Sequence, residues 1–544
     1  MSTAALYGIY DRVDGPIDED DFIHEPDGRK LEVSNIGWRG ISNVVIIATL
    51  ILALFLLFLG YPVISHYTRH RGLWENAILN GTGQIADLPL LPKLIDPDTP
   101  EGVYTRTGFD GKEYELVFSD EFETPGRSFY PGDDPFWEAV DLWYYPTKDL
   151  EWYEPGQVTT RDGHLVIVID QTDDYPGLYF KSGMIQTWNK FCFRTGYIEV
   201  SVVFPGSEDV SGYAWIMGNL CRPGYGATAE GMWPYSYDSC DLGTLPNQTF
   251  NGQPATALTG GGNPKYNNNL SWQPGQRLSA CTCKGEDHPG PFLNSEGRFR
   301  GRGAPEIDVF EAQKSKEGPG GRVTQSVQMA PFSYLYYFPN TTDSITIPHP
   351  EHTKLNSYRY SQQAVSALTD LNGTVFAKGG AQFTKFGFEY WSDPQNPKDG
   401  YITWVANDKV FTASSDVFRA DPTVQISDRL VPEEPMSIVL NLAVSQSFQA
   451  VNTAAMTFPS EYLVDYIRVW QRKGLGAEYL TCDPQDYPTS NYINRHLNAF
   501  TNRNYTLWKE AGYTFPKNSM TINAKLYHGG LVLDIPCIYH TSWT

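Results

Sequence analysis

From about Lys112 to Arg472 the sequence repeats one local pattern: short stretches rich in aromatic and β-branched residues, separated by Gly, Pro, Asn and Asp. Such stretches suit the pleated surface of a strand, and the residues between them suit turns. The 544 residues also include 49 Gly and 38 Pro, which disfavour long helices. Many short strands at this spacing predict a β-sandwich or barrel. The expected strands are 114–118, 165–170, 197–204, 213–217, 307–310, 323–329, 384–391, 401–405, 437–444 and 463–470.

The longest apolar run, 44–64, has 21 residues and no charge, and a bilayer core needs about 20. It starts too far into the chain and is too long for a cleaved signal peptide. The sequence therefore predicts one transmembrane signal anchor at 43–64. All seven cysteines follow this run, as do six N-x-[ST] sequons, at Asn80, Asn247, Asn269, Asn340, Asn372 and Asn504. Because disulfides and N-glycans form outside the cytosol, we expect a single-pass type II membrane protein of the secretory pathway (endoplasmic reticulum, Golgi or plasma membrane) with a lumenal or extracellular C-terminal part.

The rest of the chain divides by composition. Two long segments rich in turn residues interrupt the strand pattern, and long loops in compact domains are often functional. We interpret both as surface insertions in one large domain. The expected organisation is an acidic cytosolic tail at 1–42, the anchor at 43–64, a stalk at 65–111, a β domain at 112–472 with insertions at 235–304 and 332–381, and a C-terminal extension at 473–544.

Charge and missing motifs exclude several functions. The chain carries 41 basic and 63 acidic residues, a formal net charge of −22. A surface of this sign repels phosphate backbones, so nucleic acid is not an expected partner. Cys281-x-Cys283 lacks further ligands at zinc-site spacing, and the sequence has no P-loop, nucleophile elbow or H-E-x-x-H motif. We therefore expect no cofactor and no metal, and the pairing of the cysteines stays open.

The motif Glu306-Ile-Asp308-Val-Phe-Glu311 carries the candidate chemistry. In a regular strand Glu311 would face the core with its apolar neighbours, where an unpaired carboxylate is costly. One bulged residue near Val309–Phe310 would instead place all three acids on one face. Repulsion within such a row raises at least one pKa, as a retaining glycosidase requires of its general acid. A solvated acidic strand edge and a calcium site are the alternatives.

This motif resembles the signature of glycoside hydrolase family 16, a family of laminarinase-like, concanavalin-type β-jelly rolls. Other segments resemble strands of that family in the right order: 118–122, 182–184, 196–199, 213–217 and 464–470. Within the family the chain is most similar to the fungal Kre6/Skn1 group of β-glucan synthesis-associated proteins, on the segments 231–237, 303–308, 362–366 and 482–488. The resemblance implies an all-β, concanavalin-like β-jelly-roll sandwich and a role in making cell-wall β-1,6-glucan.

Position by position, the resemblance implies that Glu306 is the nucleophile, Glu311 the acid/base and Asp308 the residue that orients the nucleophile. It implies a retaining reaction on β-glucan that ends in hydrolysis or, with a sugar hydroxyl as acceptor, in transglycosylation. Other wall-synthesis proteins are further candidate partners. Many hydrolysing members carry a His on the next strand, where this chain has Gln325 and Gln328, and this difference argues against simple β-1,3-glucan hydrolysis. A non-catalytic glucan-binding or assembly factor is the alternative.

Aromatic residues near the motif are candidates for sugar binding. Trp215 and Trp233 are expected to stack on sugar rings, with Trp188 behind them, and core packing is the alternative for each. Asp465 matches a position that ligates calcium in some members of the family. One carboxylate does not make a calcium site, so we interpret Asp465 as a strand-end acid.

Overall fold

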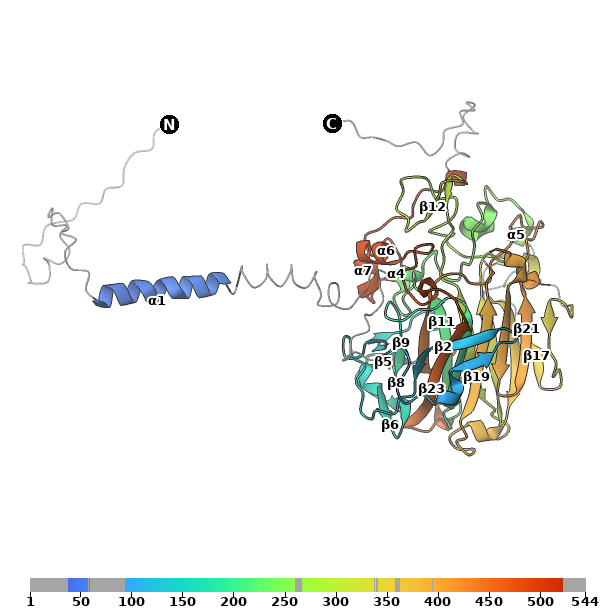
Figure 1. The fold of residues 1–544 in the computed structure, drawn as a ribbon, viewed down its shortest axis with the longest axis horizontal. Helices are drawn as coiled ribbons and strands as arrows, with labels where there is room; N and C mark the ends of the chain where they lie inside the picture. Colours follow the sequence, from blue (N-terminus) through green and yellow to red (C-terminus); the bar gives the residue numbers. More distant parts are fainter. Residues whose placement is uncertain are drawn as a thin grey trace, which may run out of the picture. The chain divides into compact units, whose positions relative to one another are not determined.

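The computed structural model describes residues 38–56, 58, 93–259, 267–336, 338, 341–357, 363–393 and 395–521, and the chain divides into two compact units, Met1–Ile78 and Leu79–Thr544. In the first unit, helix α1 (Trp38–Phe55) contains the first part of the apolar run (Figure 1). None of the helices in the described part of the chain has the length and apolar character that a bilayer crossing requires. The predicted span at 43–64 is therefore not supported, and the end of that run, 59–64, lies outside the described residues.

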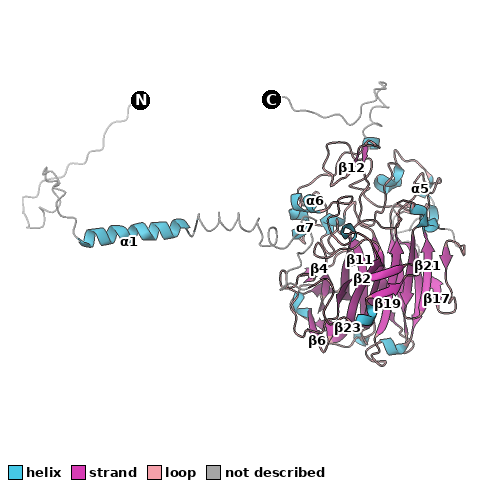
Figure 2. Cartoon of the chain, viewed as in Figure 1, coloured by secondary structure: helices cyan, strands magenta, loops and turns pink. Residues whose placement is uncertain are grey.

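The second unit is a sandwich of two sheets, which confirms the β-sandwich expected from the strand pattern (Figure 2). The larger sheet has the order β16 (Ile345–Thr346), β21 (Lys409–Ser414), β20 (Tyr401–Ala406), β19 (Thr384–Trp391), β10 (Gly196–Val203), β23 (Ser460–Arg472), β7 (His164–Gln171), β8 (Phe180–Ser182), β5 (Glu151–Tyr153) and β4 (Leu142–Trp143). Three more strands join it, β1 (Thr105–Thr107) on β2 (Glu113–Asp120), β2 on β23, and β6 (Val158–Arg161) on β7.

The smaller sheet carries the acidic motif. Its order is β17 (Thr353–Leu355), β18 (Gln363–Leu371), β15 (Gly321–Gln328), β14 (Glu306–Lys314), β11 (Ser211–Gly218), β22 (Met436–Ala443), β9 (Met184–Gln186) and β3 (Glu138–Ala139). Outside the sandwich are the ribbon β12 (Phe292–Leu293) and β13 (Arg298–Phe299) and the short helices α4 (Gly226–Ala229), α5 (Thr256–Thr259), α6 (Ser490–Arg495) and α7 (Leu497–Thr501).

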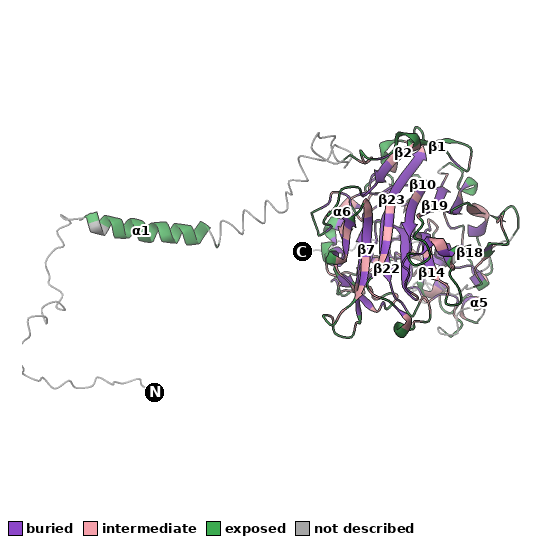
Figure 3. Ribbon diagram, turned by 90° about the horizontal axis from the view of Figure 1, so that it is seen from below, coloured by how far each residue is buried: buried purple, intermediate pink, exposed green. Residues whose placement is uncertain are grey.

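Apolar side chains on the facing sides of the two sheets form the core. In the first half of β23 buried residues such as Tyr462 and Val464 alternate with partly exposed ones, which is the two-residue period of a strand. Phe204, Phe310 and Phe386 meet between the sheets with ring centroids 5.1 to 5.3 Å apart. Figure 3 shows the result, with buried strands inside and exposed residues mainly in the connecting loops.

The folded domain extends beyond the predicted boundaries. Residues 93–111, expected as stalk, include β1, which pairs with β2. Within 332–381, expected as an insertion, β18 pairs with β15 and extends the smaller sheet. The insertion at 235–304 is largely folded, and its Tyr235 and Leu270 belong to a buried apolar cluster. Strand propensity in these segments is weak, and pairing with distant strands supplies the order that the local pattern does not predict.

Two disulfides resolve part of the cysteine pairing that the sequence left open. Cys192 is bonded to Cys482, which ties the C-terminal extension to the sandwich, and Cys240 is bonded to Cys281 within the insertion. Cys221 is a buried free thiol. The extension up to residue 521 is therefore part of the domain, and residues 522–544 lie outside the described part.

A buried ion pair links the segments that precede β14 and β22, the two strands that flank β11 in the smaller sheet. Arg302, just before β14, donates hydrogen bonds of 2.7 Å to both carboxylate oxygens of Glu434, just before β22. Arg302 also donates to the carbonyl of Pro488 in the extension, at 2.8 Å. Breaking one side of such a pair typically costs about 3–5 kcal/mol. The pair therefore fixes the start of the acidic strand relative to both the sheet and the extension.

Candidate active site

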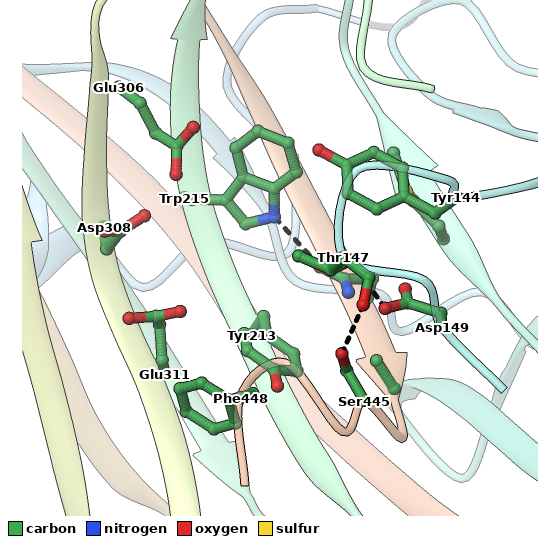
Figure 4. Close-up of a pocket in the computed structure, with 13 residues that line it drawn as sticks. Tyr144, Thr147, Asp149, Tyr213, Trp215, Glu306, Asp308, Glu311, Ser445 and Phe448 are labelled. Carbon is green, nitrogen blue, oxygen red and sulfur yellow. Dashed lines mark hydrogen bonds between the residues drawn. The ribbon is translucent and has the colours of Figure 1, made fainter. Parts of the chain in front are cut away.

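Strand β14 is irregular in the middle of the acidic motif. On the β11 side, Asp308 and Phe310 pair with consecutive residues, so Val309 is an extra residue. On the β15 side the register shifts between Asp308 and Glu311. The bulge predicted near Val309–Phe310 is therefore confirmed. It leaves Val309 and Phe310 in the core and brings Glu311 to the same cavity as Glu306 and Asp308 (Figure 4).

Two polar side chains inside the sandwich hold the bulge. The amide of Gln325 on β15 donates to the carbonyl oxygens of Val309, at 2.7 Å, and of Val405 on β20, at 3.0 Å. The indole N–H of Trp404, also on β20, donates to the carbonyl of Asp308 at 3.1 Å. A bulge leaves backbone groups outside the ladder, and a buried carbonyl without a donor is costly. These two side chains therefore stabilise the register that the acidic row requires.

Side-chain donors orient two of the three carboxylates. The indole N–H of Trp233 donates to Glu306 Oε2 at 2.6 Å. The hydroxyl of Ser326 donates to Asp308 Oδ2, and the amide of Gln328 reaches the same oxygen at 3.3 Å. Of the two glutamines noted in the sequence, Gln328 thus touches the acidic row, whereas the other one faces the core.

Burial raises the pKa of all three carboxyls, and the charge of Asp308 adds to the shift at Glu306 and Glu311. For Glu306, burial is the largest cause, the charge of Asp308 and a hydrogen bond with Asp308 raise the pKa further, and the Trp233 donor lowers it in part. For Asp308, burial raises the pKa and the Ser326 donor lowers it. Burial, followed by the charge of Asp308, raises the pKa of Glu311 well above its usual value, and within the described residues no hydrogen bond opposes this shift. Both glutamates are thus shifted toward the protonated form, and Glu311 differs from Glu306 in having, among the described residues, no donor such as Trp233 that favours its anion.

The three carboxylates form one wall of a cavity on the side of the smaller sheet that faces away from the core (Figure 4). Strands β11 and β22 supply most of its floor. The opposite wall is the segment 144–149, which joins β4 to β5, and the residues after β22 complete the rim. The lining residues are Tyr144, Thr147, Asp149, Met184, Tyr213, Trp215, Glu306, Asp308, Glu311, Asn441, Ala443, Ser445 and Phe448.

Trp215 and Trp233 lie near the acidic row but differ in position. Trp215 is part of the cavity floor, and its indole N–H donates to Asn441 Oδ1 at 2.9 Å. Trp233 packs against the apolar cluster on this side of the sheet and reaches the cavity through its bond to Glu306. Trp215 is thus placed to contact a ligand, and Trp233 is placed to position the nucleophile candidate.

Trp188 does not line this cavity, and other side chains pack on its ring. Its ring stacks on Phe500 of the C-terminal extension, with centroids 5.7 Å apart, and the guanidinium of Arg222 lies 4.6 Å from its ring centroid. Its indole N–H donates to the carbonyl of Asn219. The structure therefore does not bring Trp188 into the cavity with Trp215, and its contribution to sugar binding stays a prediction.

Nine of the thirteen cavity residues were not singled out as site residues in the sequence, among them Tyr144, Asp149, Tyr213 and Phe448. Tyr213 lies within a predicted strand next to Trp215, and its ring centroid is 5.3 Å from that of Phe448. Burial raises the pKa of Asp149 to about 6, against the effect of its hydrogen-bond donors. Tyr144 and Asp149 follow no motif, because their place depends on the pairing of β4 with β5.

The remaining site predictions fall outside this cavity. Of the sequons, two lie outside the described residues (Asn80, Asn340), two are half-buried (Asn247, Asn269) and two are exposed (Asn372, Asn504). Asp465 accepts a hydrogen bond from Ser201 at 3.2 Å, as expected of a satisfied strand acid. Across the described part of the chain, no group of three or more His, Cys, Asp or Glu is placed to hold a metal ion.

Comparison with known proteins identifies the family. The family model for Beta-glucan synthesis-associated protein SKN1/KRE6/Sbg1 matches residues 11–524. The chain belongs to this family. It is 40% identical over 525 residues to the beta-glucan synthesis-associated protein KRE6 of Saccharomyces cerevisiae, an alignment that covers 93% of this chain and 68% of that protein. It is 43% identical over 436 residues to SKN1 of the same yeast, covering 79% of this chain and 52% of that protein. The chain thus spans about half to two thirds of the length of these relatives.

Two solved structures similar to this SKN1/KRE6/Sbg1 member are bacterial and archaeal glucanases. The catalytic domain of the endo-1,3-beta-glucanase (laminarinase) of Thermotoga petrophila matches with a TM-score of 0.37 and 16% identity, covering 67% of this chain and all of that one. The endo-beta-1,3-glucanase of Pyrococcus furiosus matches with a TM-score of 0.38 and 16% identity, covering 69% of this chain and 98% of that one.

Replacing Gln325 with Leu tests whether its amide holds the bulge. The substitution leaves the carbonyls of Val309 and Val405 without this donor, and a buried acceptor that loses its partner costs about 1–3 kcal/mol. We expect the free energy of unfolding to fall by that amount in denaturant titrations. Gln382→Leu, at an exposed position, is the matched control and should change it little. A Gln325→Leu protein as stable as wild type would show that the amide is not needed.

Replacing Glu311 with Gln tests the raised pKa of the acidic row. Below the usual glutamate pKa the carboxyl is protonated in both the folded and unfolded states, so its pKa shift has no effect on stability. As the pH rises, the unfolded state ionises first, and wild type loses stability until the pH passes the raised folded pKa. We expect Glu311→Gln to unfold at higher denaturant than wild type at about pH 8, with the difference vanishing near about pH 4.

The control for this pH series is Glu317→Gln, which removes an exposed carboxyl on the same hairpin. Its stability relative to wild type should vary little with pH. A stabilisation by Glu311→Gln that is the same at both ends of the pH range would contradict the assignment.

Proposed function

We propose that this chain is a retaining β-glucan transglycosylase or hydrolase that works in the cavity on β14. The observation that carries the proposal is the row of Glu306, Asp308 and Glu311 on one face of a bulged strand. Glu306 and Glu311 pair with Met217 and Tyr213 of β11, four residues apart. Their Cα atoms are therefore separated by about 13 Å along the strand direction. Two glutamate side chains that lean together shorten this toward the roughly 5–5.5 Å of a retaining pair.

The roles follow from the surroundings of the two glutamates. In the first step the Glu306 carboxylate attacks the anomeric carbon, while Glu311 gives its proton to the departing glycosidic oxygen. In the second step the Glu311 carboxylate takes a proton from an incoming hydroxyl, whose oxygen displaces Glu306 from the anomeric carbon. The Trp233 donor favours the Glu306 anion, and the burial of Glu311 favours its acid form. Asp308 lies between them and steadies the row through Ser326 and Gln328.

The acceptor in the second step decides the outcome. Water gives hydrolysis, and a sugar hydroxyl gives transfer without net loss of linkages. The relatives of this chain are named as beta-glucan synthesis-associated proteins, and a synthetic role is served by transfer. We therefore favour transglycosylation in the building of cell-wall β-1,6-glucan.

The test compares the purified full chain with its Glu306→Gln variant on β-1,3- and β-1,6-linked gluco-oligosaccharides, with products analysed by mass spectrometry. Wild type should give products longer than the input if it transfers and only shorter ones if it hydrolyses. The variant should give neither, because an amide is a poor nucleophile. Glu351→Gln, at an exposed position, is the matched control and should retain wild-type turnover.

Two results would contradict the catalytic proposal. Equal product formation by wild type and Glu306→Gln would place the chemistry elsewhere. Unchanged oligosaccharides that bind both proteins would instead indicate a non-catalytic glucan-binding factor, with the acids as sugar contacts.

We further propose that the β domain folds and acts in the lumen of the secretory pathway or outside the cell. Two disulfides, Cys192–Cys482 and Cys240–Cys281, support an oxidising compartment. The sequon residues Asn372 and Asn504 are exposed and thus accessible to glycosylation.

Enzymatic removal of N-glycans tests this location. The chain from fungal cells should increase in electrophoretic mobility after digestion, and the Asn372→Gln/Asn504→Gln double variant should show a smaller change. Unchanged mobility of the wild-type chain on digestion, together with reduced cysteines in the isolated protein, would place the domain in a reducing compartment.

A further inference from the structure

The cavity extends across the smaller sheet from the catalytic strand. Its floor runs from β14 over β11 and β22 to β9, which are neighbours in that order. Adjacent strands lie about 4.8 Å apart, so β9 is about 14 Å from β14. Trp215 on β11, Asn441 on β22 and Met184 on β9 line this floor in turn. A ligand held at the acidic row can therefore extend only a short way in this direction before it reaches the segment 144–149.

This segment forms an end wall, which we define as residues 144–149. Tyr144, Thr147 and Asp149 line the cavity from it, opposite the acidic row (Figure 4). The hydroxyl of Ser445, after β22, donates to the carbonyl of Thr147 at 2.7 Å. Just beyond the wall, the N–H of Leu150 donates to the carbonyl of Val444 at 2.9 Å. Hydrogen bonds thus tie the end wall to the end of β22.

A bound sugar chain would run toward this end wall, so the wall limits how far the chain can extend. In a retaining reaction the two carboxyls flank the glycosidic bond. Glu306 and Glu311 follow one another along β14, so a chain held between them runs across the strands. On the β11 side it must run along the cavity floor and meet the end wall.

A chain of hydrogen bonds that begins at Trp215 on the cavity floor holds the Asp149 side chain at this end of the cavity. The indole of Trp215 donates to Asn441 at 2.9 Å, and the amide of Asn441 donates to the Tyr153 hydroxyl at 3.0 Å. That hydroxyl donates to Asp149 at 3.0 Å, and Thr147 donates to the other carboxylate oxygen at 2.6 Å. Each carboxylate oxygen has further acceptor capacity. The carboxylate is thus held in place by Thr147 and Tyr153, with Glu151 and Ser445 also in hydrogen-bond reach, and a sugar hydroxyl at the closed end would compete with these last two for its remaining acceptor sites.

From this geometry we infer that the cavity is blind-ended and takes the end of a glucan chain rather than its interior, with Asp149 accepting a hydrogen bond from a hydroxyl of the terminal sugar. The inference rests on the proposed function, since it assumes a glucan in the cavity. It makes the end wall a determinant of specificity. Transfer would then move short pieces from or to a chain end, and long chains would not be cut in the middle.

The test measures binding, so that it does not depend on turnover. The full chain with Glu306→Gln is titrated with gluco-oligosaccharides of one length in three forms: unmodified, with a bulky fluorophore at the reducing end, and with a bulky group at the non-reducing end. One of the two blocked forms should bind at least tenfold more weakly than the unmodified ligand, and the other should bind as well as it does. The end that is sensitive to blocking identifies the sugar terminus at the wall.

A second variant tests Asp149. Adding Asp149→Asn should weaken binding of the unmodified ligand several-fold, whereas the weak binding of the form blocked at the sensitive end should change little. Asp174→Asn, at an exposed position, is the matched control and should leave both affinities unchanged.

The outcomes separate this inference from the proposed function. If both blocked forms bind as tightly as the unmodified ligand, the cavity is open at both ends and the inference is overturned, while glucan binding stands. If none of the three forms binds at any linkage tested, the proposed function fails and the inference fails with it.

Discussion

The extra residue Val309 in β14 is the constraint on which the site depends. Side chains alternate along a strand, so Glu306 and Glu311, an odd number of positions apart, cannot share a face in a regular one. One inserted residue corrects the parity but disrupts the ladder. Gln325 and Trp404 supply donors to the affected carbonyls from the core side. The acidic face is therefore positioned by polar groups inside the sandwich, at a place where an all-apolar core would leave the bulge unsupported.

Features of the site that depend on residues close together in the sequence could be predicted, and features that depend on residues far apart in the sequence could not. The bulge could be predicted because the conflict that it resolves, a glutamate facing the core, is visible within six residues of sequence. The covering of Trp188 by Phe500 could not, because the two residues are more than 300 positions apart and no pattern links them. The same applies to Asp149, whose loop is placed by the pairing of β4 with β5 and of β5 with β8. The strands follow from local sequence patterns, whereas the walls of the cavity depend on contacts between residues that are far apart in the sequence.

Three acids in a row, one buried and two half-buried, would destabilise a structural protein without a compensating use. Here the surroundings differ for each acid: an indole donor on Glu306, a hydroxyl and an amide on Asp308, and burial with a neighbouring charge at Glu311. Environments that separate the protonation states of adjacent carboxyls are what acid and nucleophile roles require. Gln328 is neutral at every pH, so its electrostatic effect on Asp308 does not change with pH. A histidine at this position would gain a charge as the pH falls.

The long insertion and the C-terminal extension act on the nucleophile candidate through Trp233. The insertion contributes Arg277, whose buried guanidinium donates to the carbonyls of Ala227 and Glu230 at 3.0 and 2.7 Å. Trp508 of the extension lies over that guanidinium at 3.8 Å. These contacts fix the turn that leads directly into Trp233, and the indole of Trp233 in turn orients Glu306. A minimal sandwich without these two segments would lose the support for this indole and also the Arg302–Glu434 pair that fixes the start of the acidic strand. The segments therefore belong to the architecture of the site rather than to its periphery.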